Sequence, residues 1–437
     1  MTNQFNVAVI GAGPAGLFGA RELALQGVHI SLFNRDIKPG GLAEYGIYPE
    51  KHTMKDGLRK QFRQVLDHAN IDYYGNVSVG TQGDLTLDEL RALGFDAILV
   101  TAGAQGTKSL NLPGEELEGV YHAKDLVYFY NHLPPFSQKQ FRFGKRCAII
   151  GAGNVMVDIA RHLINVQKAD EVTAVVRRGP AEVNFTKEEM KHLISYLDMQ
   201  GFEHEMARVL PALQAINQDP EIGRHKVLDA LAKADPKTES TKFKFDFLAS
   251  PIGMVGENGK LTHLEVEENI LTEKDGKTSP KGTGKKRMIP LDTVIFAIGD
   301  KVDDNFGLPI EWNEFVKSKE PRFPVDGLSF ESTFEGVFVG GWSRKASDGL
   351  VGIARKDGTN ASKAVWSYLQ TKQAGTLNTD SLNARLKDSE KPVVLKENVK
   401  KLEEVERTEA EKRGLEEFKF DSNEDMLEAM GIAVGIA

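Results

Sequence analysis

Short apolar runs that end at a glycine recur along the chain and predict buried strands of parallel sheets. Val7–Ile10 and Cys147–Ile150 are the clearest of these runs, and each is followed by a glycine-rich turn and a helical pattern of apolar residues. A further apolar run follows each helical pattern, at His29–Phe33 and at Glu171–Val176. A strand, a glycine-rich turn, a helix and a second strand make the unit that opens a Rossmann-like domain. The pattern therefore predicts an α/β fold with two Rossmann-like domains.

The order of the remaining runs predicts that one domain is inserted into the other. Tyr73–Gly80 and Phe95–Ala104 continue the first sheet, and a turn at Pro113-Gly114 leads into the second unit. Asp292–Asp300 closes the second sheet, and a strand that ends at Gly340 is followed by a long helix. We expect a discontinuous first domain, residues 1–108 and 325–437, with residues 109–324 inserted between its parts.

Other segments carry weaker local signals. Lys187–Asp198 is typical of one helix, whereas Asp219–Thr241 is typical of polar, irregular chain. Lys274–Arg287 mixes charged residues with glycine and predicts a mobile surface hairpin. The C-terminal segment Leu402–Met430 is charged and favours helix, so we expect solvated helical faces there.

Composition narrows the function classes. The 437 residues are 41% hydrophobic and 27% charged with a net charge of −8, which is typical of a globular protein and argues against nucleic-acid binding. No basic-then-apolar leader precedes Phe5, and no apolar run approaches the ~18 residues of a membrane span. These features predict a cytoplasmic protein without a membrane partner.

The cysteine count excludes several redox chemistries. Cys147 is the one cysteine, so the chain cannot form an internal disulfide, a CxxC pair or a cysteine-ligated iron–sulfur cluster. Its place in an apolar run predicts a buried strand residue.

The first glycine turn has the spacing of a dinucleotide-binding loop. Gly11 suits the tight turn, Gly13 lets the backbone approach a pyrophosphate, and Gly16 lets helix and strand pack closely. The pyrophosphate would lie at the helix N-terminus, where unpaired N–H groups and the helix dipole favour negative charge. Asn34 occupies the usual place of a ribose-binding acid, and its amide binds ribose hydroxyls more weakly than a carboxylate does.

The second glycine turn differs in two ways. Gly151 and Gly153 repeat the spacing, but Met156 replaces the third glycine, so we expect helix and strand to lie further apart. The second strand ends in Arg177 and Arg178 instead of an acid, and guanidinium groups there suit a 2′-phosphate. We therefore predict NADP on the second loop and FAD on the first.

Motifs along nearly the whole chain resemble one family, the adrenodoxin-reductase type of ferredoxin–NADP reductase. They are GAGPAGL, PGGLAEYGIYPEKH, YYGNVSVG, LNLPGEELEGV, GAGNVMVDIAR, RRGPAEVNFTKEE, FLASPIG, GGW and DGLVG, in the family's order and spacing. The resemblance implies a flavoprotein that accepts hydride from NADPH on FAD and passes single electrons to a ferredoxin-type iron–sulfur protein or a flavodoxin.

With the two loops, the resemblance implies a set of cofactor contacts. Those with FAD are Gly11, Gly13, Ala15, Gly16, Asn34, Leu42, Val79, Trp342, Gly349, Leu350 and Val351. Those with NADP are Ala152, Gly153, Asn154, Val155, Arg177, Arg178, Glu189 and Gly349. No metal site is expected.

Three positions depart from the family pattern. Asn34 replaces a ribose-binding glutamate, and Asp348 places a carboxylate beside the redox centre. Lys51 stands where the family has a flavin-site histidine, with His52 next to it; a Lys51–Glu189 ion pair would keep the contact without imidazole proton chemistry. Hydride transfer needs close contact between nicotinamide and flavin and no protein nucleophile, so we assign Glu189, Lys51 and His52 positioning roles.

Small ferredoxins are acidic, so docking requires basic patches on this acidic chain. Two sets of basic residues are candidates, and ordinary solvated charges are an equally good interpretation of both. The sets are Lys55, Arg59 and Arg63 on one predicted helix face, and Arg224, Lys226, Lys242 and Lys244.

Three alternatives to this function stay open. A subunit resembling the small subunit of glutamate synthase shares both loops but carries cysteine clusters ahead of the first, whereas this chain starts its first strand at Phe5. An NAD(P)H-dependent flavoenzyme that reduces a small acceptor such as a quinone would turn over without ferredoxin. A non-enzymatic flavin-binding protein is the third alternative.

Overall fold

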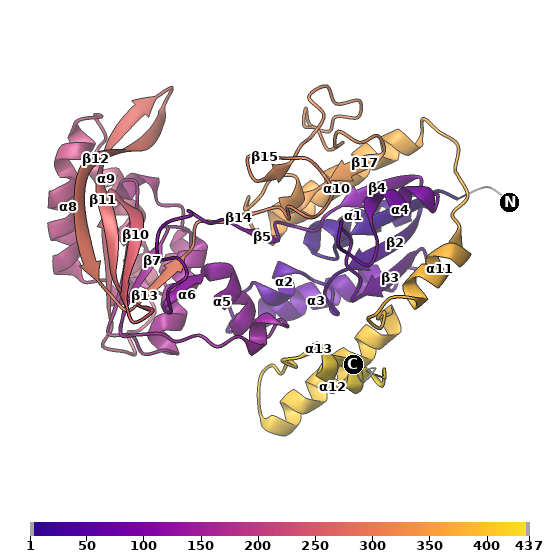
Figure 1. The fold of residues 1–437 in the computed structure, drawn as a ribbon, viewed down its shortest axis with the longest axis horizontal. Coiled ribbons are helices and arrows are strands. Elements are labelled where there is room, and N and C mark those ends of the chain that lie inside the picture. Colours follow the sequence, from indigo (N-terminus) through magenta and orange to yellow (C-terminus); the bar gives the residue numbers. More distant parts are fainter. Residues whose placement is uncertain (1–3, 434–437) are drawn as a thin grey trace. The chain divides into compact units, whose positions relative to one another are not determined.

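A computed structural model describes residues 4–433, which form two compact units (Figure 1). The first unit contains the chain up to Lys108, then Tyr128–Gln138, and the chain from Gly299 onward. The second contains Ser109–Val127 and Lys139–Ile298. The predicted α/β fold with one domain inserted into the other is confirmed.

Two points in the chain mark the outer ends of the insertion. The first piece of the first unit ends at Lys108, and the unit resumes at Gly299 after the second unit. The reason is a short antiparallel pair, in which β14 (Asp300–Lys301) bonds to β5 (Gly106–Thr107) of the first unit.

Five strands form the sheet of the first unit, in the order β17-β4-β1-β2-β3. All neighbouring strands are parallel, and Val9 on the central strand lies between Leu99 and Leu32. These side chains are fully buried, as expected for a parallel sheet that is covered on both faces. The strands are β1 (Asn6–Ile10), β2 (His29–Asn34), β3 (Ile71–Gly75), β4 (Ala97–Val100) and β17 (Val337–Val339).

The helices and small strands of the first unit complete it. Within residues 4–433 they are α1 (Pro14–Leu25), α2 (Leu42–Tyr45), α3 (His52–Leu66), α4 (Leu87–Ala92), η1 (Phe136–Gln138), β15 (Ile310–Glu311), β16 (Glu314–Phe315), η5 (Gly341–Ser343), α10 (Val351–Leu369), α11 (Thr379–Lys387), α12 (Lys396–Arg413) and α13 (Asn423–Met430). The chain passes from the second unit back to the first within α5 (Ala123–Tyr130).

The second unit repeats the same sheet, again with five parallel strands, in the order β6-β13-β7-β8-β9. The strands are β6 (Val120–His122), β7 (Arg146–Ile150), β8 (Glu171–Val176), β9 (Lys242–Phe247) and β13 (Thr293–Phe296). A separate antiparallel sheet joins β10 (Ala249–Glu257), β11 (Lys260–Lys274) and β12 (Lys277–Pro290). Its β11–β12 hairpin turns at Asp275 and Gly276, both with positive φ. The predicted segment Lys274–Arg287 thus contains the turn and most of the second strand of this hairpin, and not a whole hairpin.

The helices of the second unit correct two predictions. They are α6 (Asn154–Asn165), η2 (Pro180–Glu182), α7 (Lys187–Met190), η3 (Ile194–Tyr196), α8 (Met199–Gln214), α9 (Pro220–Leu228) and η4 (Asp229–Lys233). The single helix over 187–198 is wrong, because the Asp198 N–H donates to the carbonyl oxygen of Phe243 and draws this end of the segment onto β9. The irregular segment predicted over 219–241 is wrong for its first part, where α9 and η4 form, and right for 234–241, where the chain has no helix or strand. Asp219 caps α9 by accepting from the Glu221 N–H, and Pro220 opens the helix.

The helices within residues 4–433 are all too short or too polar to cross a lipid bilayer.

Candidate dinucleotide sites

The first glycine turn lies between β1 and α1. Gly11 has φ of 103°, and a methyl group on it would come 2.5 Å from the carbonyl oxygen of Thr101 on the neighbouring segment. A methyl group on Gly16 would come 1.9 Å from the carbonyl oxygen of Gly11, so the turn and helix require both glycines. Around Gly13 there is open space instead, and no side chain caps the first turn of α1. This turn therefore fits a pyrophosphate at the helix N-terminus.

Asn34, at the end of β2, holds the first turn from inside the protein. Its Oδ1 accepts the N–H of Ala12 at 2.9 Å, and its Nδ2 donates to the carbonyl oxygens of Asp36 and Lys38 at 2.8 and 3.0 Å. The Tyr73 hydroxyl lies 3.3 Å from the same Nδ2, and Asn34 is 7% exposed. The chain itself thus supplies partners for both polar atoms of the amide. The ribose contact of Asn34 stays a prediction.

The segment after β2 returns to the same turn. The Gly40 N–H donates to the carbonyl oxygen of Ala12 at 2.7 Å, and a methyl group on Gly41 would lie 3.2 Å from Gly13. Leu42, predicted to contact FAD, begins α2 directly after this contact. Val79 lies further along, half-buried against the core of this unit and bridged to Leu85. Leu42 is therefore carried to the first turn by backbone contacts.

The middle of α10 and the segment η5 also reach the first glycine turn. A methyl group on Gly358 would come 2.1 Å from the carbonyl oxygen of Ala15, and one on Gly341 would come 2.7 Å from the Ala15 side chain. Asp357 joins the two segments, since its carboxylate accepts the N–H of Gly341 at 2.6 Å and pairs with Arg344. Asp357 could not be found from the sequence, because an acid inside a predicted helix carries no local signal for this role.

The predicted flavin-edge residues lie at this junction. Trp342 in η5 is half-buried, and its indole N–H donates to the carbonyl oxygen of Asp348 at 3.0 Å. Gly349 has φ of 72°, and α10 begins after Leu350 without a side-chain cap. The carboxylate of Asp348 pairs with Lys345 at 3.2 Å. The backbone N–H groups in the first turn of α10, from Val351 onward, are thus left without a side-chain cap at the end of the helix that follows η5.

Lys51 and His52 begin α3, and His52 contacts the C-terminal segment. Its Nε2 lies 2.9 Å from the carboxylate of Glu416, and the side chain is 29% exposed. Lys51 precedes the helix as its N-cap residue. Their positioning roles beside flavin and nicotinamide stay predictions.

The predicted docking face of α3 is wrong at Lys55 and Arg59, whereas the Arg63 side chain is 48% exposed and pairs with Glu403 at 2.8 Å. Lys55 is 1% exposed, where its amine donates to Asn131 and Glu417, and burial lowers its pKa to about 8. The Arg59 guanidinium is bidentate to Glu44 at 2.7 Å and also binds Glu417. These two cations serve a buried ionic cluster and cannot bind a partner from solution.

That buried ionic cluster joins α2 and α3 to the C-terminal segment. Lys38 bonds to Glu44 and Glu406, and Lys419 bonds to Glu44 at 3.0 Å. The predicted solvated face of the C-terminal segment is therefore wrong at Glu406 and Lys419, which are nearly inaccessible. We define the buried ionic cluster as Lys38, Glu44, Lys55, Arg59, Glu406, Glu417 and Lys419.

The second glycine turn, between β7 and α6, repeats the geometry of the first. Gly151 has φ of 137°, and a methyl group there would come 2.4 Å from the carbonyl oxygen of Ala297. Gly153 faces open space and precedes an uncapped α6, whose second residue Val155 is exposed. Met156 has a fully buried side chain at the place that Gly16 occupies in the first turn. This second turn, too, has room for a pyrophosphate.

Two features of the second unit suit a nicotinamide dinucleotide. Arg177 and Arg178 directly follow β8. Among residues 4–433, no carboxylate lies within ion-pair distance of either guanidinium. The carbonyl oxygen of Ala152 accepts the Asn184 N–H, and the Asn154 side chain accepts the Thr186 N–H at 2.8 Å. These bonds hold the start of α7 against the glycine turn.

Glu189 lies in the short helix α7 that these bonds position, and it is half-buried. Thr186 caps this helix by accepting the Glu189 N–H at 3.3 Å. Thr-x-x-Glu is a helix-start signal, so the sequence could have located this helix boundary.

Two parallel sheets, each with a glycine turn before an uncapped helix, define a protein with two dinucleotide-binding domains. Residues 5–282 match the pyridine nucleotide-disulphide oxidoreductases, and the chain belongs to this family. The disulphide in that name has no counterpart here, because Cys147 is the one cysteine. It is buried in β7, as predicted, and burial raises its pKa to about 12.

Full-length relatives are oxidoreductases of the kind that the motifs resemble. The chain is 27% identical to the NADPH-ferredoxin reductase FprA of Mycobacterium leprae, over 97% of each chain. It is 26% identical to the mitochondrial NADPH:adrenodoxin oxidoreductase of Arabidopsis thaliana, over 80% of this chain and 79% of the relative. A solved structure of FprA from Mycobacterium tuberculosis in complex with NADPH shares the fold, with a TM-score of 0.81, 24% identity and coverage of 98% and 99%.

Proposed function

We propose that the protein is an NADPH-dependent, FAD-containing reductase of the adrenodoxin-reductase type that passes electrons to a ferredoxin-type iron–sulfur protein. The observation that carries the proposal is the pair of uncapped glycine turns, of which only the second has an unpaired arginine pair at the end of its neighbouring strand. The names of the full-length relatives support the same activity.

In this proposal, FAD binds the first unit and NADP the second. When bound there, FAD would supply the chemistry that takes up a hydride from the nicotinamide and passes on its two electrons singly. Gly13 and the first turn of α1 bind the FAD pyrophosphate, and the N–H groups of Leu350 and Val351 bind the pyrimidine side of the flavin. Trp342 packs at the flavin edge, while Leu42 and Val79 line its site.

On the NADP side, Ala152–Val155 bind the pyrophosphate and Arg177 with Arg178 binds the 2′-phosphate. Glu189 and Gly349 orient the nicotinamide end, and Lys51 and His52 position groups near the flavin. Flavodoxin as a second electron acceptor and a cytoplasmic location are further parts of the proposal.

The test is rapid-mixing reduction of the bound flavin by NADPH and by NADH, followed by flavin absorbance. We expect wild type to prefer NADPH, and Arg177→Ala/Arg178→Ala to lower that preference about ten- to a hundredfold, because charge-assisted hydrogen bonds contribute about 1.5–3 kcal/mol each. Reduction by NADH should change little, since NADH lacks the 2′-phosphate.

A control removes two lysines from the exposed hairpin of the same unit, Lys277→Ala/Lys281→Ala, and should leave the preference unchanged. Equal reduction by both nucleotides in wild type and variant would overturn the NADP assignment. NADPH oxidation with a quinone at rates far above those with ferredoxin would favour the alternative of a flavoenzyme that reduces a small acceptor.

A further inference from the structure

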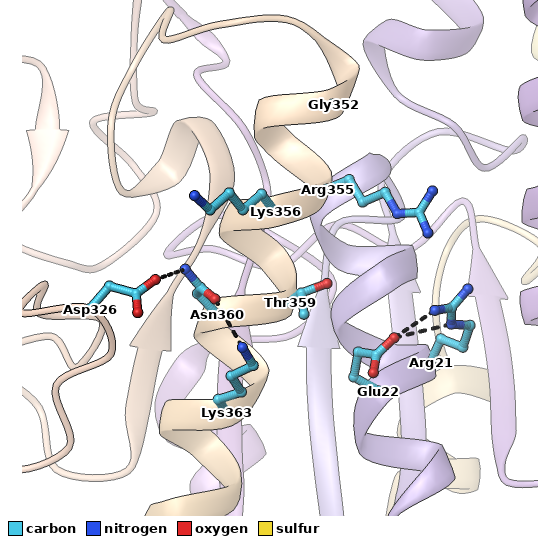
Figure 2. A pocket seen from close by; sticks show the side chains of 9 residues that line it. All are labelled: Arg21, Glu22, Asp326, Gly352, Arg355, Lys356, Thr359, Asn360 and Lys363. Atoms are coloured by element: carbon cyan, nitrogen blue, oxygen red, sulfur yellow. Dashed lines mark hydrogen bonds and ion pairs between the residues drawn. The ribbon is translucent and has the colours of Figure 1, made fainter.

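A hollow of about 460 Å³ lies between α1 and α10 on the first unit (Figure 2). Basic side chains dominate its lining, and two carboxylates lie at its edges. The charged residues are Arg21, Arg355, Lys356 and Lys363 with Glu22 and Asp326, and the uncharged ones are Gly352, Thr359 and Asn360. Four cations against two carboxylates make this surface positive on a chain whose net charge is −8.

Most of this positive charge is not neutralised within the chain. Arg21 pairs with Glu22 at 2.7 Å. Within residues 4–433, no carboxylate lies within ion-pair distance of Arg355, Lys356 or Lys363, and all three side chains are exposed. The Lys363 amine has a long contact, 3.5 Å, with the amide oxygen of Asn360. Figure 2 shows Arg355 and Lys356 on one turn of α10, pointing to opposite sides of the helix, and Lys363 farther along it.

An aromatic ring fixes the position of two of the cations. The Arg355 guanidinium carbon lies 4.3 Å from the centre of the Phe18 ring, and that of Arg21 lies 5.6 Å from the same ring. Phe18 is itself buried, so it is a rigid support for both. These two arginines are therefore held in place before any partner arrives, which lowers the entropy cost of binding.

The two patches predicted from the sequence are less suitable for docking. Lys55 and Arg59 belong to the buried ionic cluster. In the second set, Arg224 pairs with Glu203, Lys244 pairs with Glu171, and the Lys226 amine donates to the carbonyl oxygen of Ala181.

We propose that the α1–α10 basic surface, defined as Arg21, Arg355, Lys356 and Lys363, docks the acidic iron–sulfur partner; this inference rests on the proposed function. Charge complementarity identifies the partner, because carboxylates of an acidic protein match Arg355, Lys356 and Lys363, which lack carboxylates of their own. Leu350 and Ile353, which are 64% and 50% exposed at the start of the same helix, supply an apolar contact beside the charges.

The geometry of α10 suits electron transfer to a docked partner. The helix begins at the residues proposed to bind the flavin, and with a rise of about 1.5 Å per residue Lys356 lies ~8 Å along the axis from Val351. Leu350 to Lys363 spans ~20 Å, which matches an interface of about 800 Å² per partner. Each docking event transfers one electron, so one NADPH supplies two reduced partners and leaves NADP⁺ and a proton.

The experiment compares Lys356→Glu/Lys363→Glu with Lys277→Glu/Lys281→Glu, which makes the same charge change on the exposed hairpin of the second unit. An acidic [2Fe–2S] ferredoxin is the probe, with cytochrome c as terminal acceptor. We expect the first variant to raise the KM for ferredoxin about tenfold at low salt and to flatten its salt dependence, with little change in the control. Flavin reduction by NADPH should stay the same in both.

Two results would overturn the docking surface, and they are distinguishable. If wild type reduces ferredoxin and both variants have the same KM, the α1–α10 basic surface is not the docking site while the proposed function stands. If NADPH reduces the flavin but wild type does not reduce ferredoxin at all, the electron-acceptor half of the proposed function fails, and the docking surface fails with it.

Discussion

At the scale of single residues, Asn34 stands where a ribose-binding acid is usual, and its amide makes hydrogen bonds within the chain. A carboxylate at the end of the second strand normally faces the ribose. Here the amide is turned inward, where it accepts from Ala12 and donates to two carbonyl groups of the segment that leads to Gly40. An amide can both accept and donate, and a carboxylate cannot donate. Asn34 therefore cross-links the glycine turn to the following segment.

This arrangement predicts that Asn34→Glu, the substitution toward the usual acid, weakens FAD binding. The variant buries a charge and leaves the carbonyl groups of Asp36 and Lys38 without their donor, at a cost of about 2–4 kcal/mol. We expect the dissociation constant of FAD, measured by fluorescence titration of apoprotein, to rise at least tenfold. Asn34→Asp keeps the acceptor for the Ala12 N–H and loses the donors. Its dissociation constant for FAD should therefore lie between those of wild type and Asn34→Glu. Tighter FAD binding by Asn34→Glu would instead make Asn34 a ribose ligand.

The sequence predicts backbone requirements better than side-chain partners at this scale. Gly11 and Gly151 are predictable because positive φ and close approach leave no room for a side chain, and the spacing alone locates them. The partners of Asn34 depend on a segment that folds back over the turn, and the contact of His52 with Glu416 joins residues far apart in the chain. No local pattern encodes either contact.

At the scale of elements, the approach of α10 to α1 brings the proposed pyrimidine contacts to the first glycine turn. Gly358 lies against the carbonyl group of Ala15 and also faces Gly19. A methyl group added to Gly19 would come 3.1 Å from the Gly358 carbonyl oxygen. Small residues on both helices allow this close contact, and α10 contacts the sheet at β4 and β17 as well. The position of the α10 N-terminus therefore depends on Gly358.

We predict that Gly358→Ala lowers stability and loosens FAD, although alanine is the better helix former. The added methyl group would have to push apart two backbones, and overpacking costs about 1–3 kcal/mol. Gly352→Ala on the same helix is the matched control, because open space surrounds Gly352 and its stability should stay equal or rise slightly. The measurement is thermal unfolding of the FAD-loaded protein. An unchanged midpoint for Gly358→Ala would show that the helices can separate freely.

Element boundaries were predictable where capping residues mark them. Asp219-Pro220 is a strong helix start that the sequence analysis passed over, so this error was avoidable. The break of the expected helix after Met190 was not, because it arises from Leu197 and Asp198 bonding to Phe243 on β9. Such tertiary bonds outweigh helix propensity.

At the scale of the whole chain, the buried ionic cluster links the first 60 residues to the last 40 within one unit. Helical spacing correctly placed Lys55 and Arg59 on one face of α3. That face is covered by the C-terminal segment, which a charge pattern cannot reveal, because solvated and buried charges look alike in sequence. Burial is tolerated because Glu44, Glu406 and Glu417 lie opposite the cations.

Glu417 provides a test of this cluster through the pH dependence of stability. Burial alone would raise its pKa, but the nearby Lys419, Arg59 and Lys55 lower it to about 2. The folded-state pKa is thus below the ordinary value of 4.5, so the carboxylate contributes stability that is complete above pH 4.5 and is lost as pH falls toward 2. We expect Glu417→Gln to lower the free energy of unfolding by about 3 kcal/mol at pH 7, and this difference from wild type to shrink between pH 4.5 and 2.

Its neighbour offers a matched control. Glu416 is 79% exposed and pairs with His52, and a solvated pair of this kind contributes about 0–1 kcal/mol. Glu416→Gln should therefore have a free energy of unfolding, measured by denaturant titration, close to that of wild type at every pH. If Glu417→Gln is as stable as Glu416→Gln at pH 7, the buried ionic cluster does not stabilise the attachment of the C-terminal segment. Glu44 of the cluster lies in α2, two residues after Leu42, so loss of this attachment should also speed FAD release. The rate of FAD release thus separates a local effect on the C-terminal segment from an effect on the cofactor site.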